Sequence, residues 1–172
     1  MLSTASFPEL GILLGLIRKA PQTPVLDASA ATKWFLNEED TEKALALRDA
    51  HIEGDLSLTA PDLIVYEVAN ALNYHPKLSD GDLDASMKAL LELELDLVPP
   101  SVEFCSHIAD TARKLAISVY DASYIALSDM TATNLITADR KLHEKISEKG
   151  RAFLLNDMGR NLEPAEISRK IP

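Results

Sequence analysis

Short apolar runs alternate with longer amphipathic segments along most of this chain. The short runs have the length of buried strands, and they predict strands at 24–27, 56–61, 96–100, 134–139 and 151–155. The longer segments repeat their apolar residues with a helical period. They predict a helix directly after 27 that carries Trp34 and Phe35, and further helices at 41–54, 62–75, 79–95, 101–116, 121–132 and 140–150. Because strands and helices alternate, we expect an α/β fold, a three-layer α/β/α sandwich with a mostly parallel sheet.

Three of the expected helices carry signals for their ends. Gly54 closes the segment 41–54, where a C-terminal glycine is common. Ser79 opens the segment 79–95 with Asp82 three residues later, which is the spacing of a capping box. Asp62 is the expected N-cap of the segment 62–75.

Three regions divide the chain: an N-terminal helical extension with its linker (1–23), one globular domain (24–155) and a polar C-terminal tail (156–172). The 172 residues, of which 47% are hydrophobic, suffice for one domain with a substantial core. The apolar stretch 11–17 is too short to span a bilayer, and its basic residues follow it. We expect a helix packed on the domain or on a second subunit, with no membrane anchor.

The charge of the chain restricts its partners. With 17 basic and 27 acidic residues, its formal net charge is −10. General binding of polyanions is therefore excluded, and any nucleic acid must meet a local basic rim or bound cations. The single cysteine, Cys105, rules out an internal disulfide, as is usual in a reducing cytoplasm, and with Phe104 it is expected in the core.

The tripeptide Asp-Ala-Ser occurs three times in the chain. Asp27 and Asp121 each follow apolar residues and precede a helical pattern, so they are candidates for chemistry. Asp84 lies within an acidic helical segment and is expected to be a solvated surface acid.

Two further acids join these candidates, Glu67 and Asp139. Each of the three aspartates also suits the N-cap of a helix, which is the plainer interpretation of each one alone. Glu67 lies in an almost wholly apolar helix that contains no Lys or Arg, and it forms a polar stripe with Asn70 and with Asn73 or Tyr74. A buried carboxylate needs a partner, so a metal ion, a distant base or an edge position must account for Glu67.

Crowded carboxylates select a hard divalent cation such as Mg²⁺ or Mn²⁺, which removes their mutual repulsion. The four histidines are scattered without the spacing of zinc ligands. A Gly-x-Ser-x-Gly motif and a glycine-rich phosphate loop are both absent from the sequence, which disfavours serine hydrolases and P-loop nucleotide binding.

Four segments together resemble the PIN-domain ribonucleases, especially the VapC-type toxins of toxin–antitoxin pairs. They are VLDASAATKWFLNEED, APDLIVYEVANAL, VYDASYIALS and LITADRKL, in this order within residues 24 to about 155. The resemblance implies a Rossmann-like sandwich with an acidic pocket that binds Mg²⁺ or Mn²⁺ and cleaves single-stranded RNA in the cytoplasm. It implies a homodimer and a small antitoxin partner as well. By position, it assigns Asp27, Glu67, Asp121 and Asp139 as the metal-binding catalytic acids and Ser29, Asn70 and Thr137 as supporting residues.

Basic residues near two of these acids are candidates for an RNA-binding rim: Lys33, Arg140 and Lys141, followed by Lys145, Lys149 and Arg151. The alternative for the segment after Asp139 is an exposed helix face whose charges alternate with glutamates. Trp34 and Phe35 are candidates for base stacking, although their spacing favours packing in the core.

Other functions compete with the nuclease. A PIN-like fold can serve as a non-catalytic RNA-binding or assembly module, against which the full set of acids counts. A metal-dependent phosphohydrolase of the haloacid-dehalogenase kind needs a second aspartate two residues after the first, where this chain has Ser29. A response-regulator receiver needs an acid pair after its first strand, and this chain lacks it.

Overall fold

A five-stranded parallel sheet forms the centre of the computed structural model, which describes residues 23–146 and 152–158. Its strands are β1 (Val25–Leu26), β2 (Thr59–Pro61), β3 (Asp96–Val98), β4 (Leu135–Thr137) and β5 (Ala152–Leu154). They lie in the order β3-β2-β1-β4-β5, and every neighbouring pair is parallel. The expected parallel sheet is thus confirmed, although each strand is shorter than the apolar run that predicted it.

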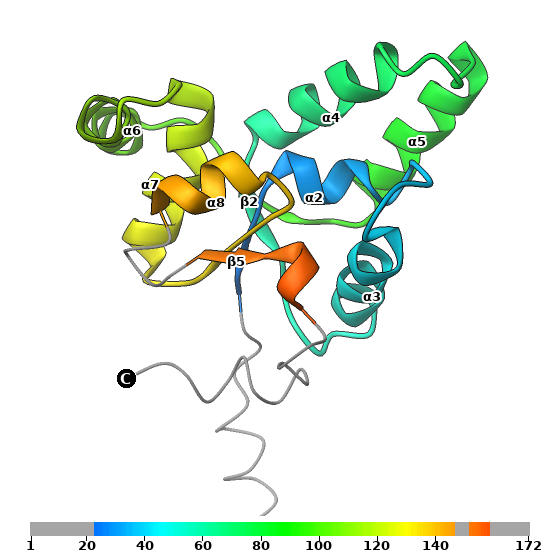
Figure 1. Cartoon of the computed structure of the whole chain (residues 1–172), viewed down its shortest axis with the longest axis horizontal. Coiled ribbons are helices and arrows are strands. Elements are labelled where there is room, and N and C mark those ends of the chain that lie inside the picture. The colour runs from blue at the N-terminus through cyan, green and yellow to red at the C-terminus, as the bar shows by residue number, and fades with distance from the viewer. Residues whose placement is uncertain (1–22, 147–151, 159–172) are drawn as a thin grey trace, which may run out of the picture.

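Helices cover both faces of this sheet, so the expected three-layer α/β/α architecture is also confirmed. Figure 1 shows α6 and α7 on one side and α3, α4 and α5 on the other. The helices are α2 (Ala28–Thr32), α3 (Thr41–Ile52), α4 (Leu63–Asn73), α5 (Asp80–Glu92), α6 (Val102–Leu115), α7 (Val119–Thr131) and α8 (Arg140–Ile146), with a 3₁₀ turn, η2, at Leu155–Asp157.

The core is centred on β2, β1 and β4, because these three strands have neighbours on both edges and all of their residues are buried. Helix α7 packs against β1, β2 and β4, and every residue from 122 to 128 is buried. On the other face, α2 packs against α4. These contacts fix the helices that carry two of the candidate acids relative to the strands that carry the other two.

The predicted helix signals are largely confirmed. Gly54 has a φ of 77° and follows α3, and the backbone bonds from Gly54 N to His51 O and from Asp55 N to Ala50 O form a Schellman motif. Ser79 and Asp82 form a reciprocal capping box at the start of α5. Asp62 occupies the N-cap position of α4, but its side chain makes no capping hydrogen bond.

Three local expectations were wrong. Helix α2 ends at Thr32, so Trp34 lies in the turn that follows, where its indole Nε1 donates to Ala44 O at 2.8 Å and its ring is buried. Helix α7 begins two residues before Asp121, because Ser118 caps it. Cys105 is exposed on α6, since the buried stripe of this amphipathic helix runs through Phe104 instead.

Some expectations concern residues outside the described ranges. The N-terminal helical extension, most of the C-terminal tail and the rim candidates Lys149 and Arg151 belong to this group. Within the described residues, no helix combines the length and the hydrophobicity needed to cross a membrane.

Candidate functional site

The candidate site lies at the carboxyl ends of β1 and β4. From β1 the sheet continues through β2 and β3 in one direction, and β4 and β5 are added next to β1 in the opposite direction. The strand order therefore reverses between β1 and β4, which is the topological switch point. In open α/β sheets, ligands bind in the crevice at this point. Leu26 pairs with Ile136, and the Asp27 N–H donates to Ile136 O at 2.9 Å, which places Asp27 alongside Thr137.

Asp27 is a buried carboxylate held by hydroxyl groups. Its side chain is 7% exposed, and Oδ2 accepts hydrogen bonds from Ser29 Oγ at 2.7 Å and from Thr137 Oγ1. Although Asp27 occupies the N-cap position of α2, its side chain makes no capping bond. Capping alone therefore does not account for Asp27, whose carboxylate is oriented by the hydroxyl groups of Ser29 on α2 and Thr137 on β4.

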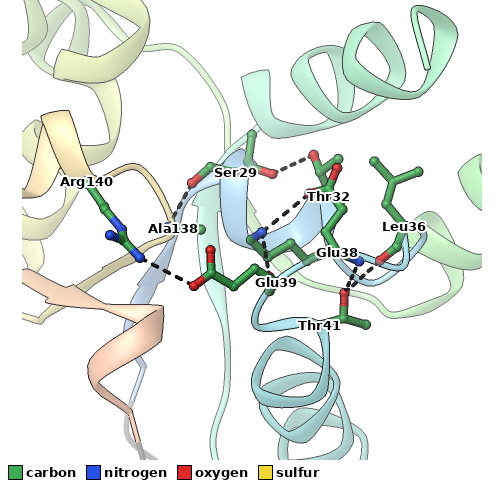
Figure 2. A network of polar contacts seen from close by, with 10 residues as sticks. Ser29, Thr32, Leu36, Glu38, Glu39, Thr41, Ala138 and Arg140 are labelled. Atoms are coloured by element: carbon green, nitrogen blue, oxygen red, sulfur yellow. Dashed lines mark hydrogen bonds and ion pairs between the residues drawn. The ribbon is translucent and has the colours of Figure 1, made fainter. Parts of the chain in front are cut away.

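The same two hydroxyl groups connect β1 to the loop after β4. Ser29 Oγ lies 3.3 Å from Thr137 Oγ1 and accepts from the Ala138 N–H at 2.9 Å, as Figure 2 shows for Ser29 and Ala138. Thr137 Oγ1 accepts from the Asp139 N–H at 3.0 Å. Because these bonds run from one strand end to the next, the position of Asp139 is coupled to that of Asp27.

Glu67 projects from α4, which covers the sheet beside α2. Its Oε2 accepts a hydrogen bond from the hydroxyl of Tyr124, a fully buried residue of α7. The Tyr124 hydroxyl is thus one of the hydrogen-bond partners that a carboxylate in an apolar helix requires. Asn70 lies one turn further along α4 and is exposed on the same side as Glu67.

Asp121 and Asp139 occupy different positions at helix starts. Asp121 is the third residue of α7 and is partly buried, and the cap of this helix is Ser118. Asp139 is exposed, and its Oδ1 accepts from the Lys141 N–H at 2.7 Å and the Leu142 N–H at 3.2 Å. The plain capping interpretation is thus right for one oxygen of Asp139 and wrong for Asp121.

The charges of the four acids act on one another. Burial raises the pKa of Asp27, and the charge of Asp139 adds to this rise. Burial also raises the pKa of Glu67, with further contributions from Asp27 and Asp121. The charge of Asp27 is therefore coupled to those of Glu67 and Asp139, and the charge of Glu67 is also coupled to that of Asp121.

This donor set has the chemistry of a hard-cation site, because it consists of carboxylate and hydroxyl oxygens whose charges repel one another. Within residues 23–146 and 152–158, no three acid, histidine or cysteine side chains are close enough to coordinate one ion together. In this structure the acids of the described residues therefore do not form a closed coordination shell.

The basic residues proposed for a rim differ in their partners (Figure 2). Lys33 Nζ donates to Glu39 O at 2.8 Å and lies 3.4 Å from Glu38 Oε2, and Arg140 lies 3.5 Å from Glu39 Oε1. Lys141 is exposed and has no ion pair within the part of the chain that the structure describes. Of the three, Lys141 is therefore the cation most accessible to a phosphate.

An open hollow of about 460 Å³ is lined by residues of α4 and α7, and Glu67 is the one candidate acid among them. It is lined by Leu63, Tyr66, Glu67, Asn70 and Tyr120. Both tyrosines are largely exposed.

Sequence reasoning missed three tyrosines at this site: Tyr66, Tyr120 and Tyr124. Tyr124 had a usable signal, because a tyrosine in a fully buried helix requires a partner for its hydroxyl. The exposure of Tyr66 and Tyr120 depends on which faces of α4 and α7 the fold covers.

The fold and site define a class of protein: a Rossmann-like α/β/α domain with a carboxylate pocket at its switch point. A family model described as PIN domain matches residues 25–148. Ribonuclease VapC3 of Pyrobaculum aerophilum is 33% identical over 125 residues, which cover 70% of this chain and 92% of that protein. The crystal structure of PAE2754 from Pyrobaculum aerophilum is similar in fold, with a TM-score of 0.59 and 19% identity over 88% of this chain and 99% of that one. The chain belongs to the PIN-domain family, as its four motifs indicated.

Proposed function

We propose that this protein is a divalent-metal-dependent endoribonuclease that cleaves single-stranded RNA. The observation that carries the proposal is the buried Asp27 carboxylate, held by Ser29 and Thr137 at the switch point and electrostatically coupled to the other acids. The similarity to a protein named Ribonuclease VapC3 supports the class of substrate.

Asp27, Glu67 and Asp121 would hold the first Mg²⁺ or Mn²⁺ ion, directly or through water, and Asp139 would complete the site or hold a second ion. Such an ion lowers the pKa of bound water and stabilises the charge that develops on the scissile phosphate. Neutralising these acids also removes the repulsion that an RNA phosphate meets at a chain with a net charge of −10.

The chain's own residues prepare this site. Ser29 and Thr137 fix the direction of the Asp27 carboxylate, and Asn70 supports the polar face of α4 beside Glu67. Burial and the negative charge of Glu67 raise the pKa of Tyr124, so its hydroxyl keeps its proton and remains a donor to Glu67 Oε2. Lys33, Arg140 and Lys141 form the rim that meets the RNA backbone.

The biological role in this proposal is that of the toxin in a type II toxin–antitoxin pair. It includes a small antitoxin protein as partner, a homodimer as the assembly and the cytoplasm as the location. The support for this role is the name of the 33% identical relative together with the four motifs.

One structural observation disfavours a phosphohydrolase of the haloacid-dehalogenase kind. That chemistry requires a second carboxylate two residues after the first, and in this chain Ser29 occupies the position and donates its hydroxyl to Asp27. The non-catalytic RNA-binding module differs from the nuclease only in activity, so an assay must separate the two.

The test is cleavage of a mixed-sequence single-stranded RNA by purified, antitoxin-free protein with Mg²⁺, Mn²⁺ or EDTA. Asp27→Asn removes a pocket acid, and Asp84→Asn is the matched control, because Asp84 is exposed on α5. We expect metal-dependent cleavage that is lost in Asp27→Asn and retained in Asp84→Asn. RNA binding by folded protein without cleavage under any metal would favour the non-catalytic module, and cleavage by Asp27→Asn would reject the site.

A further inference from the structure

A three-residue pattern occurs twice beside the acidic pocket. Residues 65–67 and 119–121 both consist of valine, tyrosine and an acid, on α4 and α7 respectively. In each helix the tyrosine directly precedes the acid, so the two side chains leave the helix about 100° apart. The two helices thus place an aromatic ring next to each acid.

Both rings are exposed although they are large. Tyr66 is 72% exposed and Tyr120 is 57% exposed. They line the same hollow as Glu67 and Asn70. Neither hydroxyl has a hydrogen bond among the described residues, so no contact within the described fold explains their position.

We infer that Tyr66 and Tyr120, with Asn70, form a subsite for one nucleobase of a single-stranded RNA, next to the phosphate that is cleaved. This inference rests on the proposed nuclease function and specifies how the same site holds its substrate. The tyrosine rings stack on the base, and the Asn70 amide donates to and accepts from its edge.

The chemistry of the hollow favours a base over a phosphate. None of its lining residues, all within the described chain, is basic, and Glu67 repels anions. An aromatic ring accepts the face of any base, and an exposed amide offers both a donor and an acceptor. Since Glu67 belongs to both the pocket and the hollow, a base in the hollow places its own phosphate at the acids.

Trp34 and Phe35, the other candidates for base stacking, pack against the core instead, as their spacing in the sequence favoured. Trp34 is buried and bonded to Ala44 O, and Phe35 packs edge-on against it. The exposed rings at the acids come from α4 and α7 instead.

The test compares Tyr66→Ala and Tyr120→Ala with Tyr66→Phe and Tyr120→Phe in full-length protein, by the KM and kcat of RNA cleavage. We expect each alanine variant to raise KM about tenfold, and each phenylalanine variant to recover most of this loss because stacking needs only the ring. Tyr74→Ala is the matched control, because Tyr74 is exposed on the same helix but does not line the hollow. We expect its KM to be unchanged.

A second arm uses an RNA that lacks the base beside the cleavage site. Wild type should bind this abasic RNA about as weakly as Tyr66→Ala binds the intact RNA, and the variant should show no further loss. Equal KM values for wild type and both alanine variants on intact RNA would overturn the subsite while leaving the nuclease in place.

Two other results would also overturn the inference. A change of molar mass in light scattering for either alanine variant would mean that the hollow is a protein interface. Absence of cleavage by the wild type would reject the proposed function, and the subsite with it.

Discussion

The buried hydroxyl of Tyr124 on α7 donates a hydrogen bond to Glu67 Oε2 on α4, and so joins helices from the two faces of the sheet. Tyr124→Phe removes this donor and leaves the ring in place. Because hydrogen bonds to charged groups are worth about 1.5–3 kcal/mol, we expect cleavage to fall by about tenfold or more. The measurement is kcat at saturating Mg²⁺.

The matched control is Tyr74→Phe, which removes the hydroxyl of an exposed tyrosine at the end of α4. It should leave kcat unchanged. If Tyr124→Phe cleaves RNA as fast as wild type, the bond to Glu67 has no part in the activity.

Thr137 links the two central strands through its hydroxyl. In Thr137→Val the shape is kept, but Asp27 loses a donor and the Asp139 N–H loses its acceptor. We expect the free energy of unfolding in urea to fall by about 1–3 kcal/mol, and Thr137→Ser to recover most of it. Equal stability of Thr137→Val and Thr137→Ser would show that the hydroxyl contributes nothing.

The stability of the metal-free protein should depend on pH through the pocket acids. The pKa values of Asp27 and Glu67 are raised in the folded chain, so the folded state binds more protons than the unfolded state. The stabilisation of the folded state by these two groups is complete below their ordinary pKa values of 3.8 and 4.5. It is lost as the pH rises through their raised pKa values in the folded chain. We therefore expect Tm in EDTA to fall as the pH is raised above the ordinary pKa values of these two groups.

Removing the acids should remove this pH dependence. The double variant Asp27→Asn, Glu67→Gln should show a flatter curve of Tm against pH in EDTA than wild type. Mg²⁺ should also flatten the wild-type curve of Tm against pH, because a bound cation neutralises the carboxylates at the pH values where they have lost their protons. Parallel curves for wild type and the double variant would locate the pH dependence elsewhere.

RNA binding by the basic rim should depend on the salt concentration. Lys141 has no ion pair within the described residues, whereas Arg140 faces Glu39. Lys141→Ala should weaken RNA binding and reduce the slope of log affinity against log salt by about 0.7, the value for one phosphate contact on a single strand. Arg140→Ala should have a smaller effect, and the reverse order would contradict this assignment.

Much of the fold follows from local patterns that the sequence displays. Alternating apolar runs and helical periods predict the parallel sheet, and Gly54, Ser79 and Asp82 mark helix ends where the structure has them. Asp27 and Asp139 follow neighbouring parallel strands, so their meeting at one edge follows from the order of elements.

Other features depend on tertiary contacts that no local pattern encodes. Trp34 lies outside α2, and its indole nitrogen donates a hydrogen bond to Ala44 O on α3. Cys105 and Phe104 are neighbours in sequence, and only the docking of α6 on α7 decides which of them is buried. The bond between Tyr124 and Glu67 likewise joins residues 57 positions apart.

The proposed function depends most on the binding of a divalent cation by the pocket acids. A calorimetric titration of the metal-free protein with Mn²⁺ tests this binding most directly. The titration compares wild type with Asp27→Asn, Glu67→Gln and the surface control Asp84→Asn. We expect wild type and Asp84→Asn to bind Mn²⁺ alike, and the two pocket variants to bind at least about tenfold more weakly, as loss of a ligand charge requires. Unchanged Mn²⁺ affinity in Asp27→Asn and Glu67→Gln would contradict cation binding by the pocket acids.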